Sequence, residues 1–584
     1  MSSSVSRPAA AGASPVAWRA AALPAWAPVL GVCLAVAALA GAVALRRLGP
    51  EADWDLRNYH LYNGFALWQG RVGRDLAPAQ LQSFLAPGLD LLYAAVLTVA
   101  NRQPMLLGAI LALPQGLAAF LAWCLARRLM PERTPGRAGL AAAAALIGVT
   151  GAAGLSTFAG AMSEMLPACA LLGALLCLGV APADWRPGWA GLLAGIAIGL
   201  KLTAAPFAVG LAVATLLVRP EFGSGRARSA ARFAAGALAG AALFGGAWWG
   251  WLWLRFGDPV FPYFNDLFHS PWTAALTDRD TRFLPHGVWQ VLGYPLFWAF
   301  GRSTLVSELP VRDPRIALGW IAAAGLAWRA RREPAAGALR GALAVWVVGY
   351  VLWEALFSIL RYLVLLEVLS GPLLIALLAP LLARAPARRA VAGGMALAVG
   401  LLAVTVVPDW GHAPPGPRVV AVRPPVFAPG SLVLLLDPSP MAYVAAFVPA
   451  SVRFVGADNN LVQPGGTGRL ARAVAAAIRD QRGPIWGLEE DRAIADATLR
   501  AYGLARGPGC VRVRSNLDGD AIRACPLVPA GLDADQRAGW HESRLARGRH
   551  TNPAPDGIIR TLAPPRRQTA PSPPAPARAA SARR

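Results

Sequence analysis

The sequence predicts an all-α polytopic membrane bundle of about 11 to 13 transmembrane helices, followed by a small extracytoplasmic α/β domain. The chain of 584 residues is 56% hydrophobic and only 15% charged, and its mean hydropathy is +0.45. Apolar runs of about 17 to 25 residues recur along it, long enough to cross a hydrocarbon core as helices. Because lipid offers the backbone no hydrogen-bond partner, these spans are expected to be helical rather than open sheet.

The elements follow in order along the chain. Residues 1–24 are a polar, basic lead-in, and the run 25–45 is longer than most signal-peptide cores, so we expect a retained first span. The amphipathic segment 46–88 follows as a loop. The remaining apolar runs are 89–100, 104–126, 138–156, 164–181, 188–218, 233–254, 288–300, 316–330, 341–358, 363–383 and 390–407. The run 188–218 is interrupted by Gly199-Leu-Lys201 and Pro206, which predicts two short helices, whereas 89–100 and 288–300 are short enough to lie at the interface instead.

Arginine clusters give the orientation. They lie in alternate loops, as the positive-inside rule requires if all of them face the cytoplasm. The clusters are Arg127, Arg128, Arg133 and Arg137; Arg219, Arg226, Arg228 and Arg232; Arg329, Arg331, Arg332 and Arg340; and Arg384, Arg388 and Arg389. The N-terminus is then cytoplasmic, and the loops 46–88 and 255–315 lie outside with everything after residue 408. This topology accounts for much of the net charge of +23, and without a recognised nucleic-acid motif we expect membrane lipids, and no nucleic acid, as partners.

Residues 408–530 have the pattern of a soluble α/β domain. Leu432–Leu436 and Val511–Val513 read as strands, and 468–480 and 490–503 have helical spacing with charged faces. From residue 531 to 584 the chain is rich in Arg, Pro and Ala, which predicts a disordered tail. Within the domain, Cys510 and Cys525 could form a disulfide if this region faces an oxidising compartment.

The richest candidate site follows the first span. Asp53-Trp54-Asp55 places two carboxylates around an aromatic ring, and Arg57, Tyr59 and His60 follow within one short stretch. The two acids could act as a general base with an electrostatic partner, or together hold a divalent cation such as Mg²⁺ or Mn²⁺. The alternative is a solvated loop with incidental acids, because a bare DxD pattern is common. No other cofactor is indicated.

Two cationic positions lie far along the chain from these acids. Lys201, the only lysine, sits between two short apolar helices, where a charge is costly and points to function; the alternative is a lysine that snorkels to the interface. Arg361 and Tyr362 join two spans on the outer side and could bind a phosphate or carboxylate, or serve only as an interfacial anchor. Glu367 is a candidate structural partner of Arg361.

In layout, residues 25–407 resemble the GT-C class of integral membrane glycosyltransferases, which use polyprenyl-phosphate-linked sugars. Gly199-Leu-Lys201, Gly257-Asp-Pro-Val-Phe261-Pro262 and Ser358-Ile-Leu-Arg361-Tyr362 look similar to segments of bacterial, mannosyltransferase-like members. The class carries an acidic residue in its first extracytoplasmic loop, which corresponds to Asp53 or Asp55. The resemblance implies a cell-envelope enzyme of the bacterial inner membrane with a periplasmic C-terminus.

The resemblance also implies the chemistry, which is hexosyl transfer from a lipid phosphate to an acceptor glycan, lipid or protein. Asp53 or Asp55 would be the general base, and Lys201 with Arg361 would bind the phosphate. Arg57, His60 and Tyr362 would assist in that binding, while Trp54 and Tyr59 would line the approach of the sugar or lipid. The alternatives are a transporter or lipid flippase with Lys201 in its translocation path, and a scaffold without catalysis.

Overall fold

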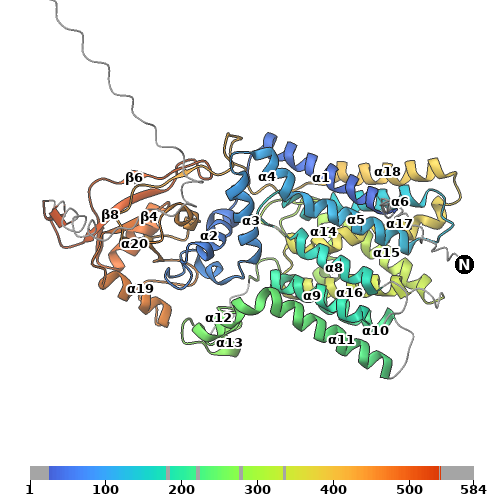
Figure 1. The fold of residues 1–584 in the computed structure, drawn as a ribbon, viewed down its shortest axis with the longest axis horizontal. Helices are drawn as coiled ribbons and strands as arrows, with labels where there is room; N and C mark the ends of the chain where they lie inside the picture. The colour runs from blue at the N-terminus through green and yellow to red at the C-terminus, as the bar shows by residue number, and fades with distance from the viewer. Residues whose placement is uncertain are drawn as a thin grey trace, which may run out of the picture.

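The computed structural model describes residues 25–162, 164–178, 185–218, 224–274, 280–332, 337–533, 535–537 and 539–540. The lead-in 1–24 and nearly all of the predicted tail 531–584 therefore lie outside the described residues. The rest is mostly helical with a C-terminal strand region (Figure 1). The helices α2 and α3 lie between the helical bundle and the strands.

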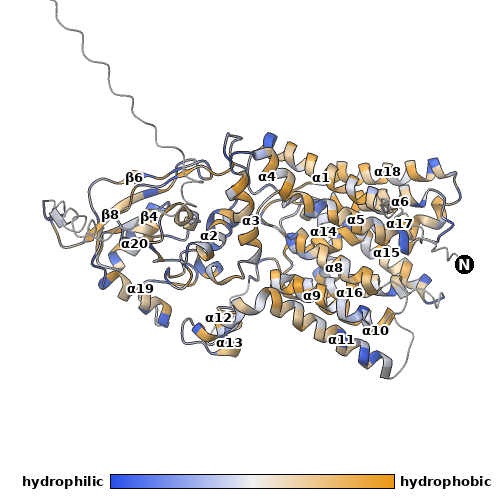
Figure 2. Cartoon of the chain, viewed as in Figure 1, coloured by the Kyte–Doolittle hydropathy of each residue, from blue (hydrophilic) through white to orange (hydrophobic). Residues whose placement is uncertain are grey.

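The bundle contains the apolar runs as separate helices. They are α1 (Ala27–Leu48), α4 (Pro104–Leu111), α5 (Leu113–Leu129), α6 (Arg137–Val149), α7 (Ala152–Ser156), α8 (Met165–Leu178), α9 (Arg186–Leu200), α10 (Ala205–Val218), α11 (Ser224–Ala241), α14 (Val288–Phe300), α15 (Arg315–Ala330), α16 (Gly337–Leu356), α17 (Val364–Leu382) and α18 (Ala387–Val404). Hydrophobic residues run along these helices, and hydrophilic ones gather near helix ends (Figure 2). The break predicted near Lys201 is present, since α9 ends at Leu200 and α10 begins at Ala205.

Fewer helices than predicted are long enough to cross a membrane. Among the described residues, six helices meet the length and hydropathy required, and four apolar helices are shorter. One reason is that long apolar runs contain turns. The run 138–156, for example, divides into α6 and α7 because Thr150 and Gly151 leave helical geometry. The chain is thus a multi-pass membrane protein by its apolar helices, and the count of 11 to 13 stays a prediction.

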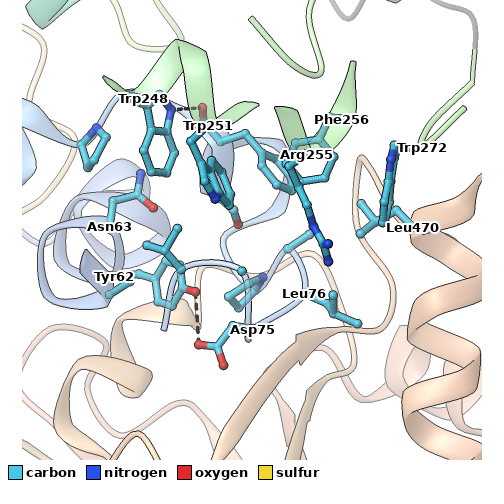
Figure 3. A pocket seen from close by; sticks show the side chains of 18 residues that line it. Tyr62, Asn63, Asp75, Leu76, Trp248, Trp251, Arg255, Phe256, Trp272 and Leu470 are labelled. Atoms are coloured by element: carbon cyan, nitrogen blue, oxygen red, sulfur yellow. Dashed lines mark hydrogen bonds between the residues drawn. The ribbon is translucent and has the colours of Figure 1, made fainter. Parts of the chain in front are cut away.

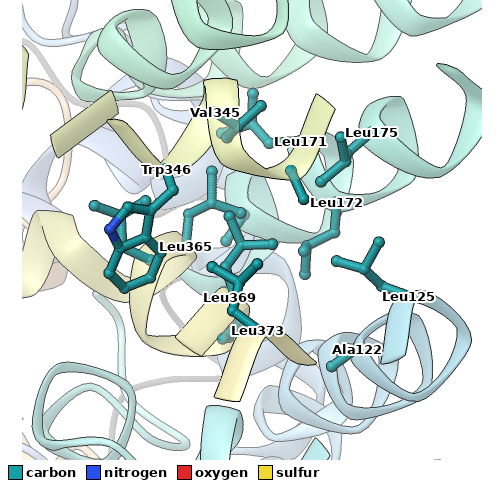
Figure 4. Packing of buried hydrophobic residues seen from close by; sticks show 14 of the residues in the cluster. Ala122, Leu125, Leu171, Leu172, Leu175, Val345, Trp346, Leu365, Leu369 and Leu373 are labelled. Atoms are coloured by element: carbon teal, nitrogen blue, oxygen red, sulfur yellow. The ribbon is translucent and has the colours of Figure 1, made fainter. Parts of the chain in front are cut away.

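The bundle core is built from aliphatic side chains of helices far apart in the sequence. Leu171 and Leu175 of α8, Leu369 of α17 and Trp346 of α16 belong to one buried cluster (Figure 4). These four side chains are nearly or fully buried. The core therefore fixes α17 at the centre of the bundle, so that the segment just before it, which contains Arg361, is held in place.

Glycines set the contact between α9 and α11. A Cβ at Gly195 would collide with the carbonyl of Ala237, and one at Gly240 would collide with the carbonyl of Leu192. Small residues let membrane helices approach this closely, so that dispersion contacts between backbones hold them together. The spacing of Gly191, Gly195 and Gly199 on α9 is the sequence signature of such a face.

Replacing a glycine in this contact should loosen the bundle. We expect Gly195→Ala to lower the free energy of unfolding by about 1 to 3 kcal/mol, because the added methyl group overpacks the helix contact. Thermal unfolding of the detergent-purified protein measures the effect. Gly400→Ala on α18 is the matched control, since nothing lies within 4 Å of its added Cβ, and equal melting temperatures for the two variants would contradict the packing argument.

The strand region is an α/β unit, and both predicted strands and both predicted helices are present in it, together with six further strands among its described residues. Its elements are β1 (Val422–Arg423), β2 (Leu432–Leu435), β3 (Arg453–Gly456), α19 (Arg469–Arg479), β4 (Ile485–Glu489), α20 (Arg492–Ala501), β5 (Leu504–Arg506), β6 (Val511–Arg512), β7 (Arg514–Ser515) and β8 (Arg523–Pro529). In the six-stranded sheet, β2 is parallel to both β3 and β4, and β8 is antiparallel to β4, β5 and β6. Cys510 and Cys525 form a disulfide at the β6 edge of this sheet.

The first outer loop packs against this α/β unit rather than lying free. It folds into the π-helical turn η1 (Leu56–His60), α2 (Leu61–Trp68) and the 3₁₀ helix η2 (Gln80–Phe84), and it is followed by α3 (Gly88–Ala100). Leu76 pairs with Val455 of β3 in a parallel bridge. Buried Arg71 donates to the carbonyls of Val448 and Val452. The α/β unit therefore holds the acidic segment against the bundle.

Candidate active site

The two aspartates have different environments. A helix begins at Trp54, and Asp53 caps it by accepting a hydrogen bond from the backbone N–H of Leu56 (2.7 Å). Both aspartates are buried, at 2% and 8% exposure for Asp53 and Asp55, which excludes the solvated loop considered above. The capping role occupies one oxygen of Asp53, whereas Asp55 is the second residue of the helix and makes tertiary contacts.

Asp55 makes an ion pair with Arg361. Its Oδ2 lies 2.6 Å from Nη1 of Arg361 and also accepts a hydrogen bond from the hydroxyl of Tyr59 (3.4 Å). The Arg361 guanidinium lies 5.5 Å from the ring centroid of Tyr362. Residues 306 positions apart are thus in direct contact. Glu367, which the sequence suggested as the partner of Arg361, does not pair with it. Its carboxylate instead accepts hydrogen bonds from backbone N–H groups in the first turn of α7.

Lys201 joins the same cluster from the break between α9 and α10. Its ammonium forms an ion pair with Glu164 at the start of α8, and lies 5.9 Å from the ring centroid of Tyr362. Lys201 is therefore not a lysine that snorkels into water, because its side chain is only 20% exposed and is paired. Lys201, Glu164, Arg361 and Tyr362 line one pocket, whose volume is about 300 Å³ with the open solvent at its mouth included.

The remaining predicted residues lie around this cluster with other partners. Arg57 faces Glu490 of the α/β unit at 4.0 Å, so it bridges the loop and that unit. His60 Nδ1 lies 2.5 Å from Oδ1 of Asp90 on α3. Trp54 is 37% exposed. The structure thus brings together Asp55, Tyr59, Lys201, Arg361 and Tyr362, and gives Arg57 and His60 contacts to other side chains.

The His60–Asp90 pair should make stability depend on pH. Burial lowers the pKa of His60, but the carboxylates of Asp90 and Asp55 more than offset it, so the pKa is raised above its usual 6.5. The stabilisation is then fully present below pH 6.5 and is lost as the pH rises through the raised value. We therefore expect the free energy of unfolding to fall as the pH rises across that window. Thermal unfolding measured at several pH values tests this, and the His60→Asn variant should not lose stability across the same window. Parallel pH profiles for the two proteins would contradict the prediction.

Two carboxyl groups next to the cluster were not singled out from sequence. Glu51 accepts a hydrogen bond from the N–H of Ala161 (2.7 Å), and burial together with the neighbouring Asp53 carboxylate raises its pKa well above the usual range. Asp90 could have been singled out from the sequence, because it is the single charged residue in the apolar run 89–100. Glu51 carried no such signal, since it stands at the polar start of the loop.

A metal ion bound by Asp53 and Asp55 would need further protein ligands. Within the described part of the chain, no group of three or more His, Cys, Asp or Glu side chains is placed to hold a metal ion. Asp53 and Asp55 as ligands of Mg²⁺ or Mn²⁺ therefore stay a prediction. The chemistry that the cluster itself offers is anion binding by two cations beside a carboxylate.

Comparison with known proteins gives one similarity in shape. No protein-family model and no curated protein matches the chain. Among solved structures, the chain is similar to the crystal structure of the oligosaccharyltransferase of Archaeoglobus fulgidus in its apo form, with a TM-score of 0.40 and 13% identity over 79% of this chain and 69% of that chain. Both values are too low for this likeness to carry an argument about activity.

Proposed function

We propose that this protein is a membrane glycosyltransferase of the GT-C type, which transfers a hexosyl group from a polyprenyl-phosphate donor to an extracytoplasmic glycan, lipid or protein. One observation carries the proposal. A carboxylate from the first outer loop, Asp55, meets Arg361 at the edge of a pocket that also contains the only lysine of the chain. This is the combination that glycosyl transfer from a lipid phosphate needs: a proton acceptor beside cations that bind the leaving phosphate.

The charges of the cluster suggest the order of events. Asp55 and Glu164 each pair with one cation, Arg361 and Lys201 respectively, so these four side chains sum to zero. A phosphate that binds both cations must compete with their carboxylate partners. Donor binding would therefore release Asp55 from Arg361 and leave a carboxylate without its ion-pair partner next to the reacting centre.

The released Asp55 would then act as the general base. It takes the proton of the acceptor hydroxyl as that oxygen attacks the anomeric carbon, which has oxocarbenium character. The bond from the anomeric carbon to the phosphate oxygen breaks, and the lipid phosphate leaves with the electron pair. Lys201 and Arg361 stabilise the charge on that phosphate. Asp53, which caps the helix, positions Asp55 in this scheme.

The orientation follows from charge and cysteine chemistry. The described arginine clusters lie where α5 meets α6, at the start of α11, where α15 meets α16, and where α17 meets α18. The positive-inside rule assigns that side to the cytoplasm. The Cys510–Cys525 disulfide is of a kind that persists in oxidising compartments. We therefore assign the α/β unit and the cluster to the periplasmic face of a bacterial inner membrane.

Purified protein in liposomes tests the proposal. The assay supplies polyprenyl-phosphate sugars with membrane-extract acceptors and measures transferred sugar and released polyprenyl phosphate. Turnover that requires the protein is expected. If lipid or sugar instead crosses the bilayer without any bond being broken, the transporter or flippase alternative holds and the proposal is wrong. Chelation with EDTA in the same assay tests the prediction of a divalent cation.

A further inference from the structure

A second pocket lies between the first outer loop, α12 (Ala247–Phe256) and the α/β unit. It encloses about 580 Å³, including open solvent at its mouth. Figure 3 shows Trp248, Trp251 and Arg255 of α12 above the cavity, Trp272 at one side, and Tyr62 below. We call it the tryptophan pocket. Three segments far apart in the sequence build it, and none of its residues belongs to the Asp55–Lys201 cluster.

The aromatic side chains of this pocket are held in fixed positions. Trp248 donates its indole N–H to the carbonyl of Phe84 (2.9 Å), and its ring centroid lies 4.9 Å from that of Trp251. Behind them, Phe256 stacks on Phe261 with centroids 4.3 Å apart. Trp248 and Trp251 are only partly buried by these contacts, and both line the cavity. Such indoles offer flat apolar faces to a ligand.

The charge available in the pocket is positive. Asp75 is fully engaged, because its oxygens accept hydrogen bonds from Tyr62 (3.1 Å), Arg71 (3.4 Å) and the N–H of Phe454 (2.9 Å). Arg255 is exposed and contacts the ring of Trp272, 5.4 Å from its centroid. Arg255 makes no hydrogen bond or ion pair with any residue of the described part of the chain. Its guanidinium is therefore free to bind an anion.

A ligand that suits these walls has an apolar face and an anionic edge. The face of a pyranose ring presents C–H groups that pack on indoles, while its edge carries polar substituents, and a uronic acid adds a carboxylate there. We propose that the tryptophan pocket binds an acidic pyranose residue of the acceptor glycan. This rests on the proposed function, which supplies the acceptor. A polyprenyl chain suits the pocket less well, because it has no anionic group that could pair with the guanidinium of Arg255.

Binding to the full-length protein in nanodiscs tests the pocket. The probes are trigalacturonate and trimannuronate, with maltotriose and mannotriose as neutral counterparts, measured by calorimetric titration. We expect the wild type to bind at least one acidic probe more tightly than its neutral counterpart. Trp251→Ala should weaken that binding about tenfold. Arg255→Gln should weaken it about 10- to 100-fold and abolish the preference for the acidic probe.

The matched controls are Trp253→Ala, whose side chain is 63% exposed on the same helix, and Arg302→Gln in the same outer region; both should bind like the wild type. The pocket assignment is overturned if no acidic probe is preferred, if the pocket variants bind like the controls, or if polyprenyl phosphate displaces the probe.

Failure of this assignment can be told apart from failure of the proposed function. Slow hydrolysis of the donor reports donor chemistry alone: water takes the place of the acceptor hydroxyl, loses its proton to Asp55 and forms the bond to the anomeric carbon, so that free sugar and polyprenyl phosphate are released. This hydrolysis should persist in Trp251→Ala and disappear in Asp55→Asn. Release that depends on Asp55 without acidic-sugar binding would overturn only the pocket. Binding without any release would overturn the proposed function instead.

Discussion

Asp55→Asn is expected to lower kcat for sugar transfer by about 10²- to 10⁴-fold, the usual contribution of a general base. The amide cannot accept the proton of the acceptor hydroxyl, although it fills the same volume. Donor affinity should change little or improve, because the substitution removes the carboxylate that competes for Arg361. Steady-state transfer in liposomes gives kcat and KM separately, and this split distinguishes a base from a binding residue.

Three further variants make the Asp55 result interpretable. Asp55→Glu keeps the charge and should retain part of the activity, which guards against a variant that simply fails to fold when Arg361 loses its partner. Asp53→Asn should lower activity less, since it perturbs only the helix cap. Asp409→Asn, at an exposed outer position, should transfer sugar like the wild type. Wild-type turnover in folded Asp55→Asn would exclude Asp55 as the base.

Lys201→Met is expected to weaken binding of polyprenyl phosphate about 10- to 100-fold, because it removes a charge-assisted contact from a half-enclosed pocket. Arg361→Gln should have an effect of similar size. Direct titration of polyprenyl phosphate into the detergent-purified variants measures it. Lys201→Arg should retain most of the affinity, because the positive charge stays.

A control variant checks that the loss of affinity is specific to the pocket. Arg302→Gln removes an outer positive charge outside the pocket, and we expect this variant to bind polyprenyl phosphate as tightly as the wild type does. Unchanged affinity in Lys201→Met, with normal folding, would remove Lys201 from the phosphate site. Equal losses in Lys201→Met and Arg302→Gln would instead indicate a general effect of net charge.

Much of the fold follows from local patterns in the sequence. Hydropathy locates the helices, and the Gly199–Pro206 interruption predicts the break that carries Lys201. The burial of the acidic segment could not be predicted in this way. It depends on contacts such as Arg71 with Val452 and Gln80 with Pro438, between residues several hundred positions apart, and periodicity carries no information about them.

The candidate site was predictable as a set of residue types but not as pairs. Unusual positions single out Asp55, Lys201 and Arg361: acids after the first span, the only lysine, and an arginine between two spans. Nearness along the chain then suggested Glu367 as the partner of Arg361, whereas the structure pairs Arg361 with Asp55. Pairing in a bundle is decided by which helix ends meet, and a single sequence does not specify this.

The most direct test of the proposed site is a cryo-electron microscopy structure with a polyprenyl-phosphonate sugar, in which a methylene group replaces the bridging oxygen and blocks transfer. We predict phosphonate oxygens within hydrogen-bond distance of Lys201 Nζ and the Arg361 guanidinium, with Asp55 separated from Arg361 and facing the anomeric carbon. A phosphonate bound elsewhere, with the Asp55–Arg361 ion pair intact, would contradict the proposed site.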